Sequence, residues 1–118
     1  MASILIADDE YTIRYGLRRF LEQKGHTVFE ACDGEDALSI MANQPVDAAV
    51  VDIIMPNKEG VETIMEVRRQ YPNVKIIAMS GGGRNRDVDF LKIAKQCGAQ
   101  DILRKPFTNE ELLKILAF

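Results

Sequence analysis

The sequence predicts a single α/β domain in which five parallel strands alternate with five helices that cover both faces of the sheet. Three observations support this prediction. Short apolar runs rich in Val, Ile and Ala recur along the chain, and each is too short to be a typical helix. Between them lie segments whose apolar residues follow the spacing of an amphipathic helix. Charged residues stand directly after several of the runs, which places them at the carboxyl ends of strands.

The five expected strands are apolar runs closed by a charged or turn-forming residue. They are residues 3–7, 27–31, 46–51, 74–79 and 101–104. The third run, from Val46 to Val51, is made largely of Val and Ala, so we expect it to be buried on both faces of the sheet. Asp52 follows this run directly, and Pro56 closes the segment.

The first two expected helices have clear ends. The first begins at Thr12 and ends at Gly25, and Ile13, Leu17, Phe20 and Leu21 would form its apolar face. The second begins with Asp33 as its N-cap and ends before Pro45, with Ala37, Leu38 and Met41 facing inward.

The third and fourth expected helices are less sharply marked. The third would end at Tyr71 before Pro72. The spacing of Val61, Ile64, Met65 and Arg68 predicts an amphipathic helix, with Met65 at a core position. The fourth, residues 86–96, is more polar and closes at Cys97 and Gly98.

The last helix has the strongest start signal in the chain. Thr108 and Glu111 fit the capping box T-x-x-E, in which each side chain bonds the other residue's backbone N–H. Phe107 and Leu112 fit the hydrophobic staple that spans a helix start. We therefore expect a helix from Thr108, with Leu112, Leu113, Ile115 and Leu116 as its buried face.

Composition limits the functional classes. With 118 residues, 47% hydrophobic and 28% charged, the chain fits one globular domain over 1–118. No apolar run is long enough to span a bilayer, and the first residues lack a signal-peptide pattern, so we expect a cytoplasmic protein without membrane contact. A net charge of −3 argues against a nucleic-acid surface.

The cysteines and the histidine do not form a recognisable site. Cys32 and Cys97 lie far apart in sequence, and His26 is distant from both, so neither a zinc spacing nor a C-x-x-C redox pair is present. A single histidine without a nucleophile beside it leaves no Ser-His-Asp or Cys-His machinery.

Carboxylates gather at the ends of two expected strands. Asp8 and Asp9 follow the first strand, and Asp52 follows the third. In a flavodoxin-like strand order of 2-1-3-4-5, the first and third strands flank the point where the winding reverses, so these acids would converge there. Taken alone, Asp52 also fits a solvated loop acid or a helix N-cap. Three converging carboxylates repel unless a cation intervenes, and an all-oxygen set selects Mg²⁺ or Mn²⁺.

Two further residues fit phosphoryl chemistry. Lys105 ends the fifth strand and Ser80 ends the fourth, beside three glycines. Three acids balanced by Mg²⁺ and one lysine make a neutral site, which can hold the added charge of a phosphoryl group on Asp52. A carboxylate nucleophile that forms an acyl phosphate is an established form of covalent catalysis.

These residues resemble the receiver domain of two-component response regulators over essentially the whole chain. The matching motifs are Asp8-Asp9, Asp52 with Met55-Pro56, Ser80, and Lys105-Pro106-Phe107. Together they are highly specific. The strand order given above rests in part on this resemblance.

The resemblance implies a role for each residue. Asp52 would accept phosphate from a phosphohistidine on a sensor histidine kinase or a histidine phosphotransfer protein. Asp9 would bind Mg²⁺ directly and Asp8 mainly through water, with the backbone carbonyl of Ile54 as a further ligand. Lys105 would contact the phosphoryl group and form a cis peptide with Pro106.

The resemblance also implies the output. Ser80 and Lys105 would respond to the phosphoryl group as switch residues, and the surface of the fourth helix, fifth strand and fifth helix would then change for a downstream protein partner. Because no output segment follows Phe118, a stand-alone receiver is expected, with a fragment of a larger regulator as the alternative.

Three departures from the family pattern stand out. Ile102 occupies the switch position where the family usually carries Tyr or Phe. The spacing from Ser80 to Lys105 is longer than usual, with the extra residues falling in 81–86. Ile54 and Gly82 occupy the positions that tune hydrolysis, and neither can position water, so we expect slow autodephosphorylation.

Two other functions compete with the phosphorylated switch. The first is a protein-interaction module on the same scaffold that works without phosphate, which Ile102 and the long loop favour. The second is a phosphohydrolase with an aspartyl nucleophile, but such enzymes use a second acid where this chain has Ile54. We therefore expect no enzymatic activity beyond the chain's own phosphorylation and dephosphorylation.

Overall fold

The computed structural model describes residues 1–53, 60–80, 92 and 94–116. Its elements are β1 (Ser3–Ala7), α1 (Tyr11–Gln23), β2 (Thr27–Ala31), α2 (Gly34–Asn43), β3 (Ala48–Asp52), α3 (Gly60–Gln70), β4 (Lys75–Ser80), β5 (Asp101–Arg104) and α5 (Asn109–Ile115). The strands pair in parallel in the order β2-β1-β3-β4-β5, which confirms the predicted doubly wound fold.

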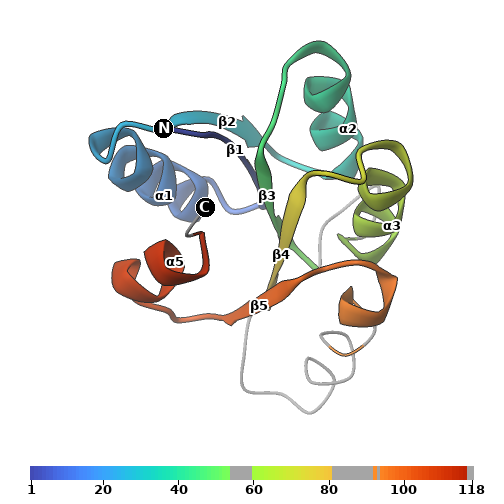
Figure 1. Cartoon of the computed structure of the whole chain (residues 1–118). Helices are drawn as coiled ribbons and strands as arrows, with labels where there is room; N and C mark the ends of the chain where they lie inside the picture. The colour runs from blue at the N-terminus through green and yellow to red at the C-terminus, as the bar shows by residue number, and fades with distance from the viewer. Residues whose placement is uncertain (54–59, 81–91, 93, 117–118) are drawn as a thin grey trace.

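The sheet separates two helical layers. Figure 1 shows α1 and α5 on one side of the sheet and α2 and α3 on the other. Each layer packs on alternate residues of the strands, because successive side chains of a strand point to opposite faces. Ile4, Ile6, Val50 and Ile77 belong to the core on the α1–α5 side. Leu5, Val51, Ile76 and Ala78 belong to the core on the α2–α3 side.

The element boundaries follow local sequence signals closely. Asp33 caps α2 by accepting a hydrogen bond from the backbone N–H of Asp36. Thr108 and Glu111 form the predicted capping box at the start of α5. The third strand begins two residues later than predicted, at Ala48. The backbone of Asp47 still hydrogen-bonds the carbonyl oxygen of Ser3 and the N–H of Lys75, and its carboxylate also accepts a hydrogen bond from the N–H of Ser3.

The predicted core position of Met65 in α3 is wrong. Met65 has 53% of its surface exposed, whereas the buried residues of the helix are Gly60, Thr63, Ile64 and Val67. These four follow the i, i+3, i+4, i+7 spacing of one stripe, and Met65 lies about 100° around the helix from Ile64. An apolar residue next to the stripe was therefore assigned to the core, and the polar Thr63 within it was missed.

The fourth expected helix falls mostly outside the described residues. Residues 92 and 94–97 are helical, and Ala94 is buried on the α2–α3 side of the sheet. No helix of the described chain is both long and apolar enough to cross a membrane.

Candidate functional site

Asp52 lies at the carboxyl end of the central strand. All five residues of β3 are buried, because β1 and β4 flank this strand and helices cover both of its faces. Asp52 itself is only 6% exposed. It has the same position in the alternation as Ala48 and Val50, which face the α1–α5 layer. The strand therefore presents a nearly buried carboxylate on that side of the sheet edge.

Asp8 directly follows β1, the neighbouring strand, and is fully buried. Its backbone N–H continues the pairing with β2 through a hydrogen bond of 3.1 Å to the carbonyl oxygen of Ala31. Its Oδ1 accepts a hydrogen bond of 2.9 Å from the backbone N–H of Glu10. Asp9, the next residue, is exposed. The loop between β1 and α1 thus offers one buried and one accessible carboxylate.

The three acids converge as the sequence predicted. Carboxylate oxygens of Asp8, Asp9 and Asp52 all lie within 4.8 Å of one another. The donor set consists only of oxygen, and one member is accessible from solvent, so these residues fit a hard divalent cation such as Mg²⁺ better than zinc. The predicted further ligand, the carbonyl of Ile54, lies outside the described residues.

Lys105 brings a positive charge into the same cluster. Its Nζ lies 2.7 Å from Oδ2 of Asp8 and 3.3 Å from Oδ2 of Asp52. Burial alone lowers the pKa of this ammonium, but the hydrogen bond to Asp8 and the charge of Asp52 outweigh burial, so the pKa lies above its usual value. Three carboxylates against one ammonium leave two excess negative charges, the charge that one divalent cation balances.

The backbone around Lys105 ties β5 to β4. The N–H of Lys105 donates a hydrogen bond of 2.8 Å to the carbonyl oxygen of Ser80, and the Lys105–Pro106 peptide is cis. Ser80 ends β4 and is fully buried. The structure therefore brings Lys105 to the carboxylates and holds Ser80 at the next strand end.

Ile102 lies on the opposite side of the sheet from the Lys105 ammonium. It pairs with Ala78 in the β4–β5 ladder and packs against the core on the α2–α3 side. By strand alternation, Ser80 belongs to this same side. The predicted loop extension at 81–86, with Gly82, lies outside the described residues.

Comparison with known proteins decides what this arrangement is. The family model of the response regulator receiver domain matches residues 4–117. The chain belongs to this family. As a receiver domain it is a phospho-accepting part of a two-component system, with an acidic pocket of Asp8, Asp9 and Asp52 beside Lys105. A receiver domain is not an enzyme in the classical sense, and a two-component receiver implies a cognate kinase.

Relatives and solved structures agree on this assignment. The response regulator GtcR of Aneurinibacillus migulanus is 39% identical over 92% of the chain, which covers 43% of that protein. The chemotaxis protein CheY4 of Vibrio cholerae is 32% identical, with a TM-score of 0.89 over 98% of this chain and 96% of that one.

A third relative carries the modification itself. The structure of a response regulator protein from Burkholderia pseudomallei, with a phosphorylated aspartic acid and a calcium ion, matches with a TM-score of 0.89 and 25% identity over 98% of this chain and 66% of that one.

The chain spans less than half the length of the curated relatives that it matches.

Two residues that support the site were not recognised from the sequence. A Cβ at Gly60 would overlap the carbonyl oxygen of Asp52 and the Cα of Ile53, so α3 begins in direct contact with the backbone of the central strand. Arg14 donates a hydrogen bond of 2.7 Å to the carbonyl oxygen of Asp8. A glycine at the start of a helix was the available signal for the first.

Proposed function

We propose that Asp52 accepts a phosphoryl group from a phosphohistidine. The observation that carries this proposal is the convergence of Asp52, Asp8 and the Lys105 ammonium at the ends of three strands. A carboxylate oxygen of Asp52 attacks the phosphorus, the P–N bond to the histidine breaks, and its electron pair stays on the imidazole, which takes up a proton. The phosphorylated aspartic acid in the Burkholderia structure supports the same chemistry here.

The surrounding residues would perform separate tasks in this transfer. Asp8, Asp9 and Asp52, together with the carbonyl of Ile54, would hold Mg²⁺, or Mn²⁺ in its place. This cation would supply charge neutralisation for the phosphoryl oxygens. Both carboxylate oxygens of Asp8 already accept hydrogen bonds, which favours Asp9 as the direct ligand and Asp8 as one that acts through water.

Lys105 and Ser80 would stabilise the product. The ammonium of Lys105 already bridges Asp8 and Asp52, so a phosphoryl oxygen on Asp52 would lie within its reach. The hydroxyl of Ser80 would swing toward the phosphoryl group and donate a further hydrogen bond to it. This movement of Ser80 would begin the change in the surface that includes β5 and α5. A downstream protein would recognise that change.

The phosphodonor would be a sensor histidine kinase or a histidine phosphotransfer protein. A groove of about 670 Å³ opens beside Lys105, between α1 and the segment that leads into α5. Ile13, Leu17, Pro106 and Phe107 supply apolar lining to it. An apolar groove next to the acceptor site suits docking of another protein.

Intact mass spectrometry tests the acceptor. The protein is incubated with Mg²⁺ and acetyl phosphate beside Asp52→Asn and the control Asp101→Asn, which removes a half-exposed acid whose ion-pair partner, Lys75, is 3.9 Å away. We expect one added phosphoryl group on the wild type and on the control, and none on Asp52→Asn or in EDTA. If neither acetyl phosphate nor a phosphorylated kinase adds mass to the wild type, the interaction module that works without phosphate becomes the better hypothesis.

A second variant tests docking. Ile13→Glu places a charge in the groove without touching the carboxylates. It should slow transfer from a phosphorylated partner protein and leave the labelling by acetyl phosphate at the wild-type rate. Equal slowing with both donors would contradict docking at this groove.

A further inference from the structure

Hydrogen bonds with four other residues fix Asp8 in the loop that also carries Asp9. Every polar group of Asp8 has a partner: its N–H bonds to Ala31, its Oδ1 accepts from Glu10 and its Oδ2 accepts from Lys105. The fourth group, its backbone carbonyl, accepts a hydrogen bond from Nη1 of Arg14 at 2.7 Å. Of the other three partners, Ala31 ends β2, Glu10 belongs to the loop itself and Lys105 directly follows β5, so among the four only Arg14 reaches back from a helix.

The guanidinium of Arg14 is fixed on several sides. Its Nε lies 3.2 Å from Oε1 of Glu30 on β2, and its Cζ lies 5.7 Å from the centre of the Tyr11 ring. Only 14% of the Arg14 side chain is exposed. A planar guanidinium with one arm on a carboxylate and another on a carbonyl has one geometry available, unlike a surface arginine that samples many.

The carbonyl that Arg14 holds belongs to the peptide between Asp8 and Asp9. A planar peptide whose oxygen is fixed also has its N–H and the following Cα fixed. The Asp9 side chain is exposed and has no hydrogen bond or ion pair within the described residues, so nothing else there sets its direction. We propose that Arg14 is a positioning residue, which aims the Asp9 carboxylate toward Asp52 by fixing the Asp8–Asp9 peptide.

This inference rests on the proposed cation site. Partners of the ligating groups typically change metal affinity 10- to 100-fold when they are removed. Arg14 contacts the backbone that carries the ligand Asp9 and not the Asp9 carboxylate itself, so we expect its effect on Mg²⁺ affinity at the lower end of that range. The consequence is a loss of Mg²⁺ affinity in a chain that is otherwise intact.

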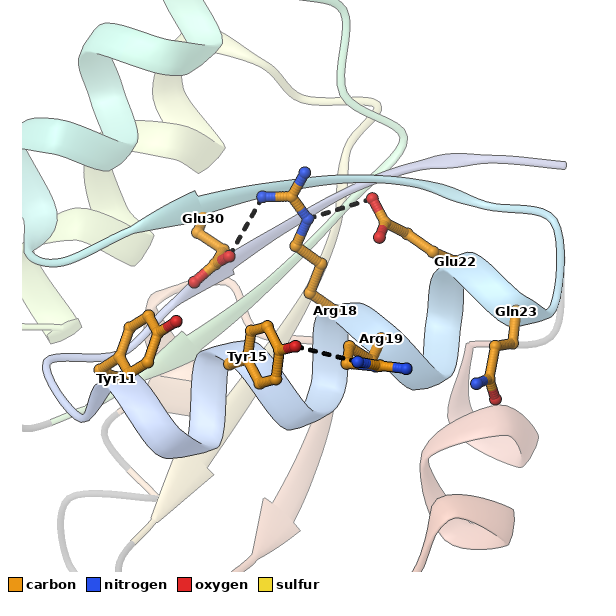
Figure 2. A pocket seen from close by; sticks show the side chains of 7 residues that line it. All are labelled: Tyr11, Tyr15, Arg18, Arg19, Glu22, Gln23 and Glu30. Atoms are coloured by element: carbon orange, nitrogen blue, oxygen red, sulfur yellow. Dashed lines mark hydrogen bonds and ion pairs between the residues drawn. The ribbon is translucent and has the colours of Figure 1, made fainter.

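Arg18 provides a matched control on the same helix. Figure 2 shows its guanidinium between Glu22 and Glu30, at 3.1 and 3.2 Å. Arg14 and Arg18 thus share Glu30, but only Arg14 contacts the carbonyl of Asp8. Replacing either arginine by methionine removes one positive charge near the acids, and that loss alone would strengthen Mg²⁺ binding. A weaker affinity therefore cannot come from the charge.

The experiment measures the Mg²⁺ affinity of the unphosphorylated chain by titration calorimetry, with MgCl₂ as the probe. We expect Arg14→Met to bind Mg²⁺ about tenfold more weakly than the wild type. Arg18→Met should bind with wild-type affinity or more tightly. If Arg14→Met does not fold, judged by circular dichroism, Arg14→Lys takes its place with the same expected direction, because one ammonium cannot replace the two-armed contact.

A second measurement needs no metal. The carbonyl ¹³C chemical shift of Asp8 reports the hydrogen bond to its oxygen, and it should move in the Arg14 variant and stay in Arg18→Met. Wild-type Mg²⁺ affinity in a folded Arg14 variant would overturn the positioning role alone. An equal loss in Arg18→Met would also overturn it. No Mg²⁺ binding by the wild type would overturn the cation site and the positioning role together.

Discussion

Gly60→Ala should damage the site through the backbone of the acceptor strand. The added Cβ would overlap the carbonyl oxygen of Asp52 and the Cα of Ile53, and it would lie 2.8 Å from the carbonyl carbon of Ile53. All three atoms are backbone, so no side chain can rotate away. Overpacking in a buried site typically costs about 1 to 3 kcal/mol. The hydrogen bond of 3.2 Å from Gly60 to the Ile53 carbonyl would also weaken, at about 1 kcal/mol.

We therefore expect Gly60→Ala to lower the free energy of unfolding by about 3 kcal/mol, close to 12 °C in Tm for a domain of this size. Urea unfolding followed by circular dichroism measures this directly, because the chain has no tryptophan. The labelling of Asp52 by acetyl phosphate should fall as well, since the strand end that carries the carboxylate must shift to admit the methyl group.

Gly16→Ala is the matched control within α1. A Cβ at Gly16 meets no atom within 4 Å, and alanine is the better helix former. This variant should gain about 0.5 to 1 kcal/mol. If Gly60→Ala keeps its free energy of unfolding within about 0.5 kcal/mol of the wild type, a change typical of harmless surface substitutions, the close approach of α3 to the acceptor strand is refuted.

Three further predictions follow from single contacts. Thr108→Ala removes the capping box of α5 and should cost about 1 kcal/mol in urea unfolding, whereas Thr108→Ser should cost little; equal losses would contradict the cap. Arg68→Met leaves the carbonyl oxygens of Pro72, Val74 and Gly98 without the guanidinium donor. The free energy of unfolding in urea should fall by about 2 to 3 kcal/mol, and a loss below about 1 kcal/mol would show that water replaces the guanidinium. Desolvation and neighbouring acids raise the pKa of the Cys32 thiol, so less thiolate is present at pH 8 in the folded protein. Alkylation of Cys32 by iodoacetamide should therefore be slower in the folded protein than in urea, and equal rates would contradict the raised pKa.

Local patterns were enough to predict the fold because most elements are marked in their own sequence. The strands Ser3–Ala7, Thr27–Ala31 and Asp101–Arg104 begin and end where the apolar runs do. The acids could be placed together for the same reason, since the carboxyl ends of parallel strands meet at one edge of the sheet. The third strand begins at Ala48 and not at Val46, and the hydrogen bond from the N–H of Ser3 to the Asp47 carboxylate just before it is a contact between segments that no local pattern contains.

Contacts between segments also explain what the sequence did not show. Gly60 could have been a helix start of any kind, and only its closeness to the backbone of Asp52 and Ile53 shows that a side chain there must displace the strand end. Met65 was assigned to the core because it is apolar and adjoins Ile64, although the stripe that packs on the sheet passes through Thr63. The family assignment indicates the chemistry of the residues at the strand ends, but it does not show which other residues hold them in place.

The role of Arg14 could have been suspected from its charge and its position in the helix, which the spacing of apolar residues does not take into account. It lies in the first turn of α1, where a positive charge opposes the helix macrodipole and where acidic residues are favoured. Side chains of a helix also point back toward its N-terminus, so a long cation at this position lies over the preceding loop. A charge that the helix disfavours must be stabilised elsewhere, and here Glu30 and the carbonyl of Asp8 do so. An arginine in the first turn after a pair of acids is therefore better interpreted as part of the site than as a solvated surface residue.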